Sequence, residues 1–166
     1  MKKIVFVCLG NICRSPVAEG LLKTKIRQKG LTDQFFADSA GTSSYQLGNP
    51  PHETSTKIAK QNGVMLNHFA KQFTSNDFSR YDYIICMDDK NYTNVIDLAK
   101  SDSDKEKVYL IRQWEAGPTL DRLESAGPVP DPYGGPIDGF IRVHQLLDEC
   151  TDNLMEYLIK TEIQPQ

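Results

Sequence analysis

Short, continuous apolar runs alternate along this chain with longer segments in which apolar residues recur every three or four positions. The continuous runs at residues 4–7, 81–87 and 108–111 are typical of strands buried on both faces of a parallel sheet. A shorter β-rich run at residues 35–38 predicts one more strand. Helical patterns separate and follow these runs, so the chain is predicted to alternate strands with helices.

Four helices are predicted from the apolar periodicity. The first begins at Ser15, where a serine is a good N-cap and Pro16 suits the first helical position. A second covers residues 52–62 and is closed by Gly63, a third follows residue 87, and a long one covers residues 138–160. Three of them show an apolar face, formed by Val17, Ala18, Leu21, Leu22 and Ile26 in the first, Tyr92, Val95, Ile96 and Ala99 in the third, and Phe140, Val143, Leu147, Cys150, Leu154 and Leu158 in the last.

This alternation predicts an α/β fold: a three-layer sandwich with a central, mostly four-stranded parallel sheet and helices on both faces. A length of 166 residues suits a single domain, residues 1–166. Ligands of such sheets bind at the carboxyl ends of the strands. Two segments rich in Gly, Pro, Ser and Asp, residues 41–51 and 113–136, are predicted to be loops at that end, and long loops in a compact domain are usually functional.

Composition narrows the classes of partner. The net charge is −3 and 25% of residues are charged, a balance that argues against a nucleic-acid or anionic-membrane surface. The amino-terminal apolar run stops at Gly10, too short for a signal peptide, and no stretch has the length of a membrane span. We therefore expect a cytoplasmic protein without membrane insertion, and any anion it binds must be held by a local site.

The four cysteines, Cys8, Cys13, Cys86 and Cys150, are too few for a disulfide scaffold, and no C-x-x-C pair predicts a zinc site. We expect no metal and no cofactor. Cys86 and Cys150 lie in core patterns and are expected to pack as small apolar residues. His52 and His144 are expected to be ordinary residues on helix surfaces.

The loop between the first strand and the first helix contains the most specific chemical signal. Backbone N–H groups of such a loop can converge on an anion, Gly10 would permit unusual backbone angles, and Arg14 offers a planar fork to two phosphate oxygens. Cys8 would lie at the bottom of this cradle, where the helix N-terminus and the guanidinium stabilise a thiolate. The bare spacing C-x5-R is a weak signal, but its place between a buried strand and a Ser-Pro helix start strengthens it.

At this point the chain resembles a known family, the low-molecular-weight protein tyrosine phosphatases. The resemblance is carried by CLGNICRSP at residues 8–16, DSAG at 38–41, GNPP at 48–51, HFAKQ at 68–72, YDYIICMD at 81–88 and DPY at 131–133. It implies a cysteine-dependent phosphatase that hydrolyses phosphotyrosine in proteins in two steps. Cys8 would be the nucleophile, Arg14 the phosphate clamp, and Asp131 the acid that protonates the leaving oxygen and then the base that activates water.

The resemblance also implies supporting roles. Leu9, Gly10, Asn11, Ile12 and Cys13 would form the substrate-binding loop, with Tyr45 and Tyr133 as walls for the phenyl ring. Asn11, Ser15, Ser39 and His68 would hold that loop in shape, although a helix N-cap alone also explains Ser15. Cys13 is either a small buried thiol or a redox partner that protects an oxidised Cys8. The partners would be phosphotyrosine proteins, with a tyrosine kinase as one candidate, and the protein a monomer or weak dimer.

Three alternatives remain open. A thioredoxin-linked arsenate reductase shares the anion cradle but needs neighbouring cysteines past the middle of the chain, and Cys86 has none before Cys150. A protein-arginine phosphatase of the same scaffold usually has threonine where this chain has Ile12. A phosphate-binding module without turnover would need neither a nucleophile nor an acid.

Overall fold

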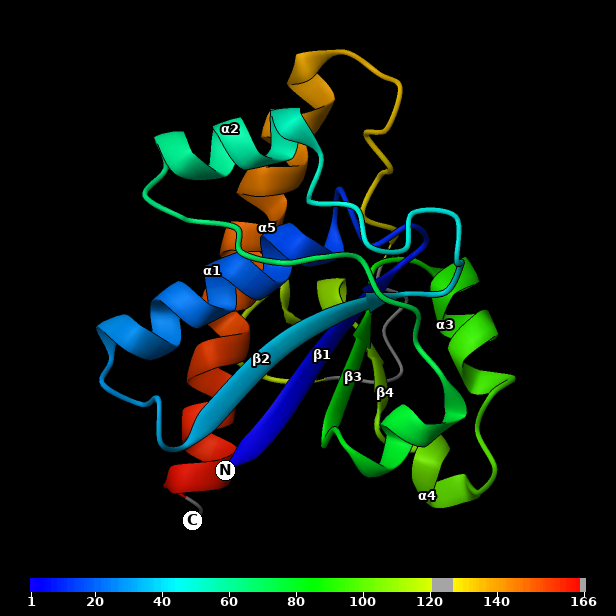
Figure 1. The fold of residues 1–166 in the computed structure, drawn as a ribbon. Helices are drawn as coiled ribbons and strands as arrows, with labels where there is room; N and C mark the ends of the chain where they lie inside the picture. Colours follow the sequence, from blue (N-terminus) through cyan, green and yellow to red (C-terminus); the bar gives the residue numbers. More distant parts are fainter. Residues whose placement is uncertain (121–126, 165–166) are drawn as a thin grey trace.

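The computed structural model describes residues 1–120 and 127–164 as one layered α/β unit (Figure 1). Its sheet contains β1 (Lys2–Cys8), β2 (Phe35–Gly41), β3 (Tyr83–Cys86) and β4 (Val108–Leu110), in the order β2-β1-β3-β4. All neighbouring strands are parallel. The predicted fold class is therefore confirmed, and every strand ends at the same edge of the sheet.

Helices lie on both faces of this sheet. The longer ones are α1 (Ser15–Gln28), α2 (Glu53–Gln61), α3 (Asp89–Ile96) and α5 (Ile137–Leu158). Short elements complete the described chain: α4 (Asp102–Lys105), the 3-10 helices η1 (Ser75–Ser79) and η2 (Ile111–Trp114), and a π-helical turn, η3 (Ile159–Ile163). No helix of the described residues is long and apolar enough to cross a membrane.

Alternation along β1 divides the core into two layers. Ile4 and Phe6 are fully buried against α1 and α5. Val5 and Val7 are fully buried on the opposite face, in the layer that contains Val95 of α3. β1 lies inside the sheet and has helices on both sides, so neither of its faces is exposed to water. Its run of apolar residues is continuous for that reason.

The predicted element bounds hold with small corrections. β2 continues to Gly41 because that residue still pairs with Cys8, whereas β3 begins only at Tyr83. α3 ends at Ile96, and Ala99, predicted on its apolar face, follows in a turn that still packs against the core. Of the loop predicted over residues 113–136, the start belongs to η2, and residues 121–126 lie outside the described residues.

The expectation for the two helix-surface histidines is wrong. His144 is only 6% exposed, because α5 presents this side of the helix to α1 and to the segment after α2. His52 is half-buried and caps α2, with Nδ1 accepting from Thr54 N at 3.1 Å, and its ring stacks on Phe140 with 4.8 Å between centroids. Both side chains are therefore part of the packing between helices.

Candidate active site

The loop between β1 and α1 turns around one residue with a left-handed backbone. That residue is Asn11, with φ of 59°, and it is fully buried. The prediction that Gly10 supplies the unusual angle is wrong, because an asparagine tolerates this conformation when its side chain is held. Gly41 allows the close approach instead: a Cβ there would lie 2.7 Å from Leu9 O and 3.1 Å from Asn11 Cβ.

Cys8 receives two contacts at its sulfur from within this loop. Asn11 N donates to Sγ at 3.2 Å, and Ser15 Oγ lies 3.0 Å from Sγ. Asn11 Nδ2 donates to the same Ser15 oxygen at 2.8 Å, which leaves the serine hydrogen available to the sulfur. A charged sulfur accepts such donors more strongly than a neutral thiol does.

Ser15 is not the N-cap of α1. Arg14 occupies that position, no side chain caps the helix, and Pro16 stands in its first turn as predicted. The hydroxyl that the sequence offers as a cap is used on Cys8 Sγ. The N-cap explanation for Ser15 is therefore wrong, and its hydroxyl contacts Asn11 Nδ2 and Cys8 Sγ within the loop instead.

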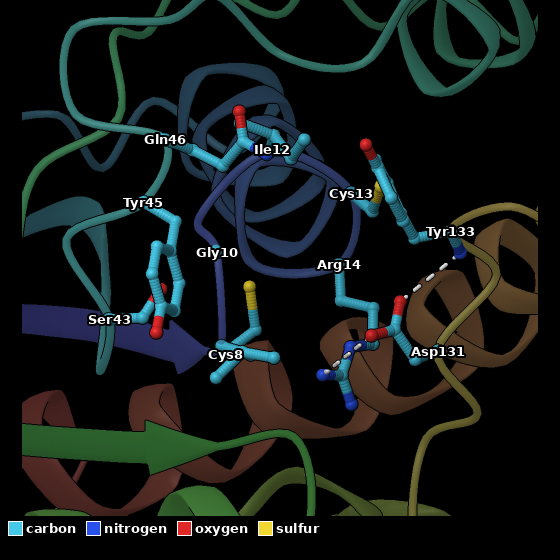
Figure 2. A pocket seen from close by; sticks show the side chains of 11 residues that line it. Cys8, Gly10, Ile12, Cys13, Arg14, Ser43, Tyr45, Gln46, Asp131 and Tyr133 are labelled. Carbon is cyan, nitrogen blue, oxygen red and sulfur yellow. Dashed lines mark hydrogen bonds and ion pairs between the residues drawn. The ribbon is translucent and has the colours of Figure 1, made fainter.

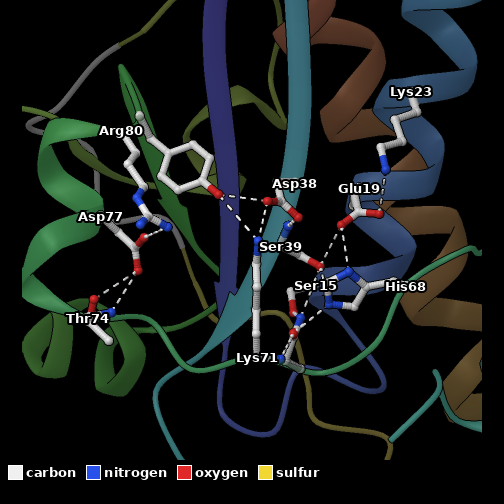
Figure 3. A network of polar contacts seen from close by, with 12 residues as sticks. Ser15, Glu19, Lys23, Asp38, Ser39, His68, Lys71, Thr74, Asp77 and Arg80 are labelled. Atoms are coloured by element: carbon white, nitrogen blue, oxygen red, sulfur yellow. Dashed lines mark hydrogen bonds and ion pairs between the residues drawn. The ribbon is translucent and has the colours of Figure 1, made fainter. Parts of the chain in front are cut away.

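The side chain of Asn11 is the centre of a buried polar network. Figure 3 shows Ser15, Ser39, His68 and Lys71, which belong to it. Nδ2 also donates to Ser39 Oγ at 3.0 Å, and Oδ1 accepts from Lys71 N at 3.0 Å and lies 2.6 Å from His68 Nε2. These are the loop-support residues expected from the sequence, with the backbone of Lys71 added. Together they fix the one strained residue of the loop.

Glu19 completes this network and was not anticipated. It is 2% exposed, accepts from Ser39 Oγ at 2.9 Å, and lies 3.2 Å from His68 Nδ1. Nε2 of His68 thus faces Asn11 Oδ1, and Nδ1 faces Glu19 on the other side of the ring. The available signal was a lone acid one turn after Ser15 on the apolar face of a predicted helix.

Arg14 is 2% exposed, and its guanidinium is fixed from one side. Nη1 donates to Asp88 Oδ2 at 2.7 Å and to Val129 O at 3.1 Å, and Nη2 lies 3.7 Å from Asp131 Oδ2. Burial alone would lower the pKa of Arg14, but the charges of Cys8, Asp88 and Asp131 raise it above its ordinary value. The cation is therefore permanent.

Asp88 is a second residue without a predicted role. It lies two residues after the end of β3 and is the N-cap of α3, where Oδ1 accepts from Asn91 N at 2.8 Å while Oδ2 accepts from Arg14. An acid at the carboxyl end of a predicted strand was the signal that could have found it, since the first strand ends at Cys8 on the same edge.

A pocket of about 130 Å³ opens above Cys8 (Figure 2). Tyr45 and Tyr133 lie on opposite sides of its mouth, 89% and 59% exposed, and Asp131 lies beside Arg14. The Tyr133 ring meets His52 edge-on at 5.9 Å between centroids. The lining is Cys8, Leu9, Gly10, Ile12, Cys13, Arg14, Ser43, Tyr45, Gln46, Asp131 and Tyr133, of which Ser43 and Gln46 had not been predicted.

Comparison with known proteins fits this geometry. The family model described as low molecular weight phosphotyrosine protein phosphatase matches residues 3–164. The chain belongs to that family. The resemblance noted in the sequence is thereby confirmed.

Relatives within the family are similar over nearly their whole length. The low molecular weight phosphotyrosine protein phosphatase of Homo sapiens is 34% identical, covering 93% of this chain and 94% of the human protein. A crystal structure of a protein tyrosine phosphatase from Entamoeba histolytica has a TM-score of 0.85 at 36% identity, covering 98% and 97% of the two chains. A Drosophila arginine phosphatase has a TM-score of 0.83 at 29% identity, covering 95% and 97%.

The remaining cysteines differ from Cys8 in their surroundings. Cys13 is 4% exposed and lines the pocket, and burial, helped by the charge of Cys8, raises its pKa to about 12. Burial likewise raises the pKa of Cys150 to about 12 and that of Cys86 well above its ordinary value. Cys86 and Cys150 are fully buried, as predicted for packing residues.

Three potential metal ligands of the described chain come together in the support network, Glu19, Asp38 and His68. Each already has protein partners. Lys23 contacts Glu19, Lys71 and Tyr81 contact Asp38, and Asn11 contacts His68. These protein contacts occupy the three side chains, so the cluster supports the loop between β1 and α1.

Proposed function

We propose that this protein hydrolyses phosphotyrosine in proteins by a two-step reaction through a cysteinyl-phosphate at Cys8. The observation that carries the proposal is the sulfur at the base of the pocket, contacted by Asn11 N and Ser15 Oγ, with Arg14 and Asp131 beside it. A tetrahedral anion in that pocket would meet a nucleophile, a cation and an acid at once. The substrates named for its relatives support phosphotyrosine as the ester.

In the first step Cys8 Sγ attacks phosphorus, the sulfur–phosphorus bond forms, and the bond from phosphorus to the phenolic oxygen breaks. Asp131 gives its proton to the departing oxygen, which leaves as tyrosine. Arg14 holds two phosphoryl oxygens with Nε and Nη2, because both hydrogens of Nη1 are used on Asp88 and Val129. The backbone N–H groups of residues 9–14 add further donors to the developing charge.

In the second step water attacks the phosphorus of the cysteinyl-phosphate and Asp131, now ionised, takes a proton from it. The sulfur–phosphorus bond breaks, inorganic phosphate leaves the pocket, and Cys8 is regenerated as a thiolate. Asp131 regains in this step the proton that it gave up in the first, and its 45% exposed side chain at the pocket can reach both the leaving oxygen and the attacking water.

Substrate choice would come from the walls. Tyr45 and Tyr133 flank a slot for a phenyl ring, and Leu9 and Ile12 line its mouth. The longer phosphotyrosine carries its phosphate down to Cys8, whereas phosphoserine is too short.

The protein partners would be phosphotyrosine proteins, a tyrosine kinase among the candidates. The enzyme would be a single domain, residues 1–166, that acts as a monomer or weak dimer. A role of Cys13 as redox partner of Cys8 belongs to the same proposal.

The contacts of the pocket and the burial of the cysteines support the competing functions less well. An arsenate reductase relay would need a second thiol that can leave the core, and Cys86 and Cys150 are fully buried in different core layers. Because the Drosophila neighbour is named an arginine phosphatase, phosphoarginine is the second substrate to test. The apolar Ile12 in the pocket lining argues against phosphoarginine, since arginine phosphatases of this scaffold usually have threonine there. A binding module would leave Cys8 and Asp131 without use.

Steady-state hydrolysis of p-nitrophenyl phosphate, a phosphotyrosine peptide and a phosphoarginine peptide tests the proposal. We expect turnover with the first two, none with Cys8→Ser, and a cysteinyl-phosphate that accumulates in rapid-quench mass spectrometry of the wild type. Cys150→Ser serves as the matched thiol control and should keep its activity if it folds. Absence of turnover, or a phosphoarginine peptide cleaved faster than the phosphotyrosine peptide, would overturn it.

A further inference from the structure

We propose that Arg112 is a positioning residue for the acid Asp131, because it holds the carbonyl of Pro128 at the start of the segment that presents this carboxylate. Arg112 Nη1 donates to Pro128 O at 2.8 Å. The inference rests on the proposed function, in which Asp131 protonates the leaving oxygen. It adds a residue outside the pocket to the machinery of that step.

Arg112 is itself well fixed. It belongs to η2, directly after β4, and its guanidinium makes a two-pronged contact with Glu115: Nε to Oε2 at 2.8 Å and Nη2 to Oε1 at 3.1 Å. Such a fork restricts rotation of the guanidinium plane, so the two Nη1 hydrogens have fixed directions. One of them is donated to the Pro128 carbonyl.

Successive carbonyls of the acid segment are thus held by two different arginines. Arg112 binds Pro128 O, and Arg14 binds Val129 O at 3.1 Å. Val129 is fully buried, and its own N–H donates to Met87 O at 2.8 Å. The backbone just before Asp131 is therefore tied both to the phosphate clamp and to the end of the sheet.

Little slack separates this anchor from the carboxylate. Pro128, Pro130 and Pro132 alternate with Val129 and Asp131, and proline fixes φ near −65°. The Arg112 contact at Pro128 O and the two contacts of Val129 therefore act together in setting where this stiff segment places Asp131. Beyond Asp131 the Tyr133 N–H donates to Oδ1 at 3.2 Å, which orients the carboxylate locally but does not locate it relative to the sheet.

Gly127 shows how closely the guanidinium approaches this backbone. A Cβ at this position would lie 3.0 Å from Arg112 Nη1 and 3.5 Å from Cζ. Any side chain at residue 127 would press on the arginine. Gly127→Ala therefore perturbs the hydrogen bond between Arg112 Nη1 and Pro128 O from the backbone side.

The same region supplies a matched control. Arg142 of α5 is exposed and lines, with Arg112 and Pro130, a cleft of about 290 Å³ below the acid segment. Replacing it removes the same charge and a similar side-chain volume from this cleft. Within the described residues Arg142 makes no hydrogen bond to residues 127–133, so it is a test of nonspecific effects.

The test is the leaving-group dependence of kcat/KM, which reports the steps up to release of the phenol. We would compare wild type, Arg112→Met, Arg112→Lys, Arg142→Met and Asp131→Ala on aryl phosphates whose phenols span a range of pKa. General acids contribute about 10²–10⁴-fold, so for Arg112→Met we expect a loss of about 10-fold on phenyl phosphate and under about 3-fold on an activated ester. Arg112→Lys, which keeps one donor, should fall between.

The outcomes separate the two proposals. If Asp131→Ala loses activity equally on all esters, the acid role fails and the proposed function fails with it. If Asp131→Ala is selective but Arg112→Met loses activity uniformly, or no more selectively than Arg142→Met, the positioning role is wrong. Should Arg112→Met fail to fold, Gly127→Ala and Glu115→Gln decide in its place, and an unchanged leaving-group dependence in both overturns the proposal.

Discussion

Ser15 Oγ lies 3.0 Å from Cys8 Sγ, and the same hydroxyl accepts from Asn11 Nδ2 at 2.8 Å, which leaves its hydrogen available to the sulfur. Asn11 N donates to the same sulfur at 3.2 Å. The buried asparagine thus contacts the sulfur through its backbone and holds the neighbouring serine through its side chain.

Ser15→Ala should slow formation of the cysteinyl-phosphate. A hydrogen bond to a charged group contributes about 1.5–3 kcal/mol, so we expect a loss of about 10- to 100-fold in single-turnover rate. Ser55→Ala is the matched control, because this buried serine donates to Cys13 O at 3.3 Å and not to the sulfur. Equal losses in both variants would show that only loop packing is at work.

Asp88→Asn should weaken phosphate binding while preserving the fold. Asparagine keeps the Oδ1 acceptor for Asn91 N but loses the charge that holds Arg14 at 2.7 Å. We expect the inhibition constant of inorganic phosphate to rise by about 10-fold, the value of one charge-assisted hydrogen bond. Asp88→Ala should in addition lose about 1 kcal/mol of unfolding free energy with the cap.

The exposed acid in the first turn of α3 gives the control for that experiment. Asp89→Asn removes the same charge one residue away without touching Arg14. A phosphate inhibition constant raised as much by Asp89→Asn as by Asp88→Asn would contradict a specific role of Asp88.

Gly41→Ala should damage stability and activity together. The new Cβ would lie 2.7 Å from Leu9 O and would push on the loop that contains Asn11. Overpacking of this kind destabilises by about 1–3 kcal/mol, measurable by urea denaturation. Gly139→Ala in α5, where the nearest atom would be 3.8 Å away, should instead stabilise by up to about 1 kcal/mol. A fully active Gly41→Ala would refute the close approach.

His144 should make stability fall on mild acidification. Burial lowers the pKa of this histidine, against a raising effect of Asp148 and with a further lowering by Lys25. The unfolded chain then binds more protons than the native one once the pH drops below roughly 6.5, so unfolding becomes easier as pH falls toward the native pKa.

Chemical denaturation of wild type and His144→Gln between about pH 7.5 and 5 measures this effect. The unfolding free energy of the variant should depend less on pH than that of the wild type. Parallel curves for the two proteins would show that His144 does not carry the pH dependence.

The sequence was sufficient for the architecture because strand burial and helix periodicity are local patterns. It was also sufficient to bring Cys8, Arg14 and Asp131 to one end of the sheet, since parallel strands share that end. It was not sufficient for Asn11, where the left-handed backbone depends on partners as distant as His68 and Lys71. Glu19, Asp88 and the burial of His144 were missed for the same reason: each is defined by contacts across the fold.

The two sides of the pocket are attached in different ways. The Tyr45 side is fastened by main-chain hydrogen bonds, from Thr42 N to Cys8 O at 2.9 Å and from Ser43 N to Leu9 O at 3.0 Å. The Asp131 side has one main-chain bond to the end of the sheet, from Val129 N to Met87 O at 2.8 Å, and is otherwise held by two arginine side chains. For inhibitor design, the rigid part of a scaffold therefore belongs against the first side, and rotatable bonds should be reserved for the second.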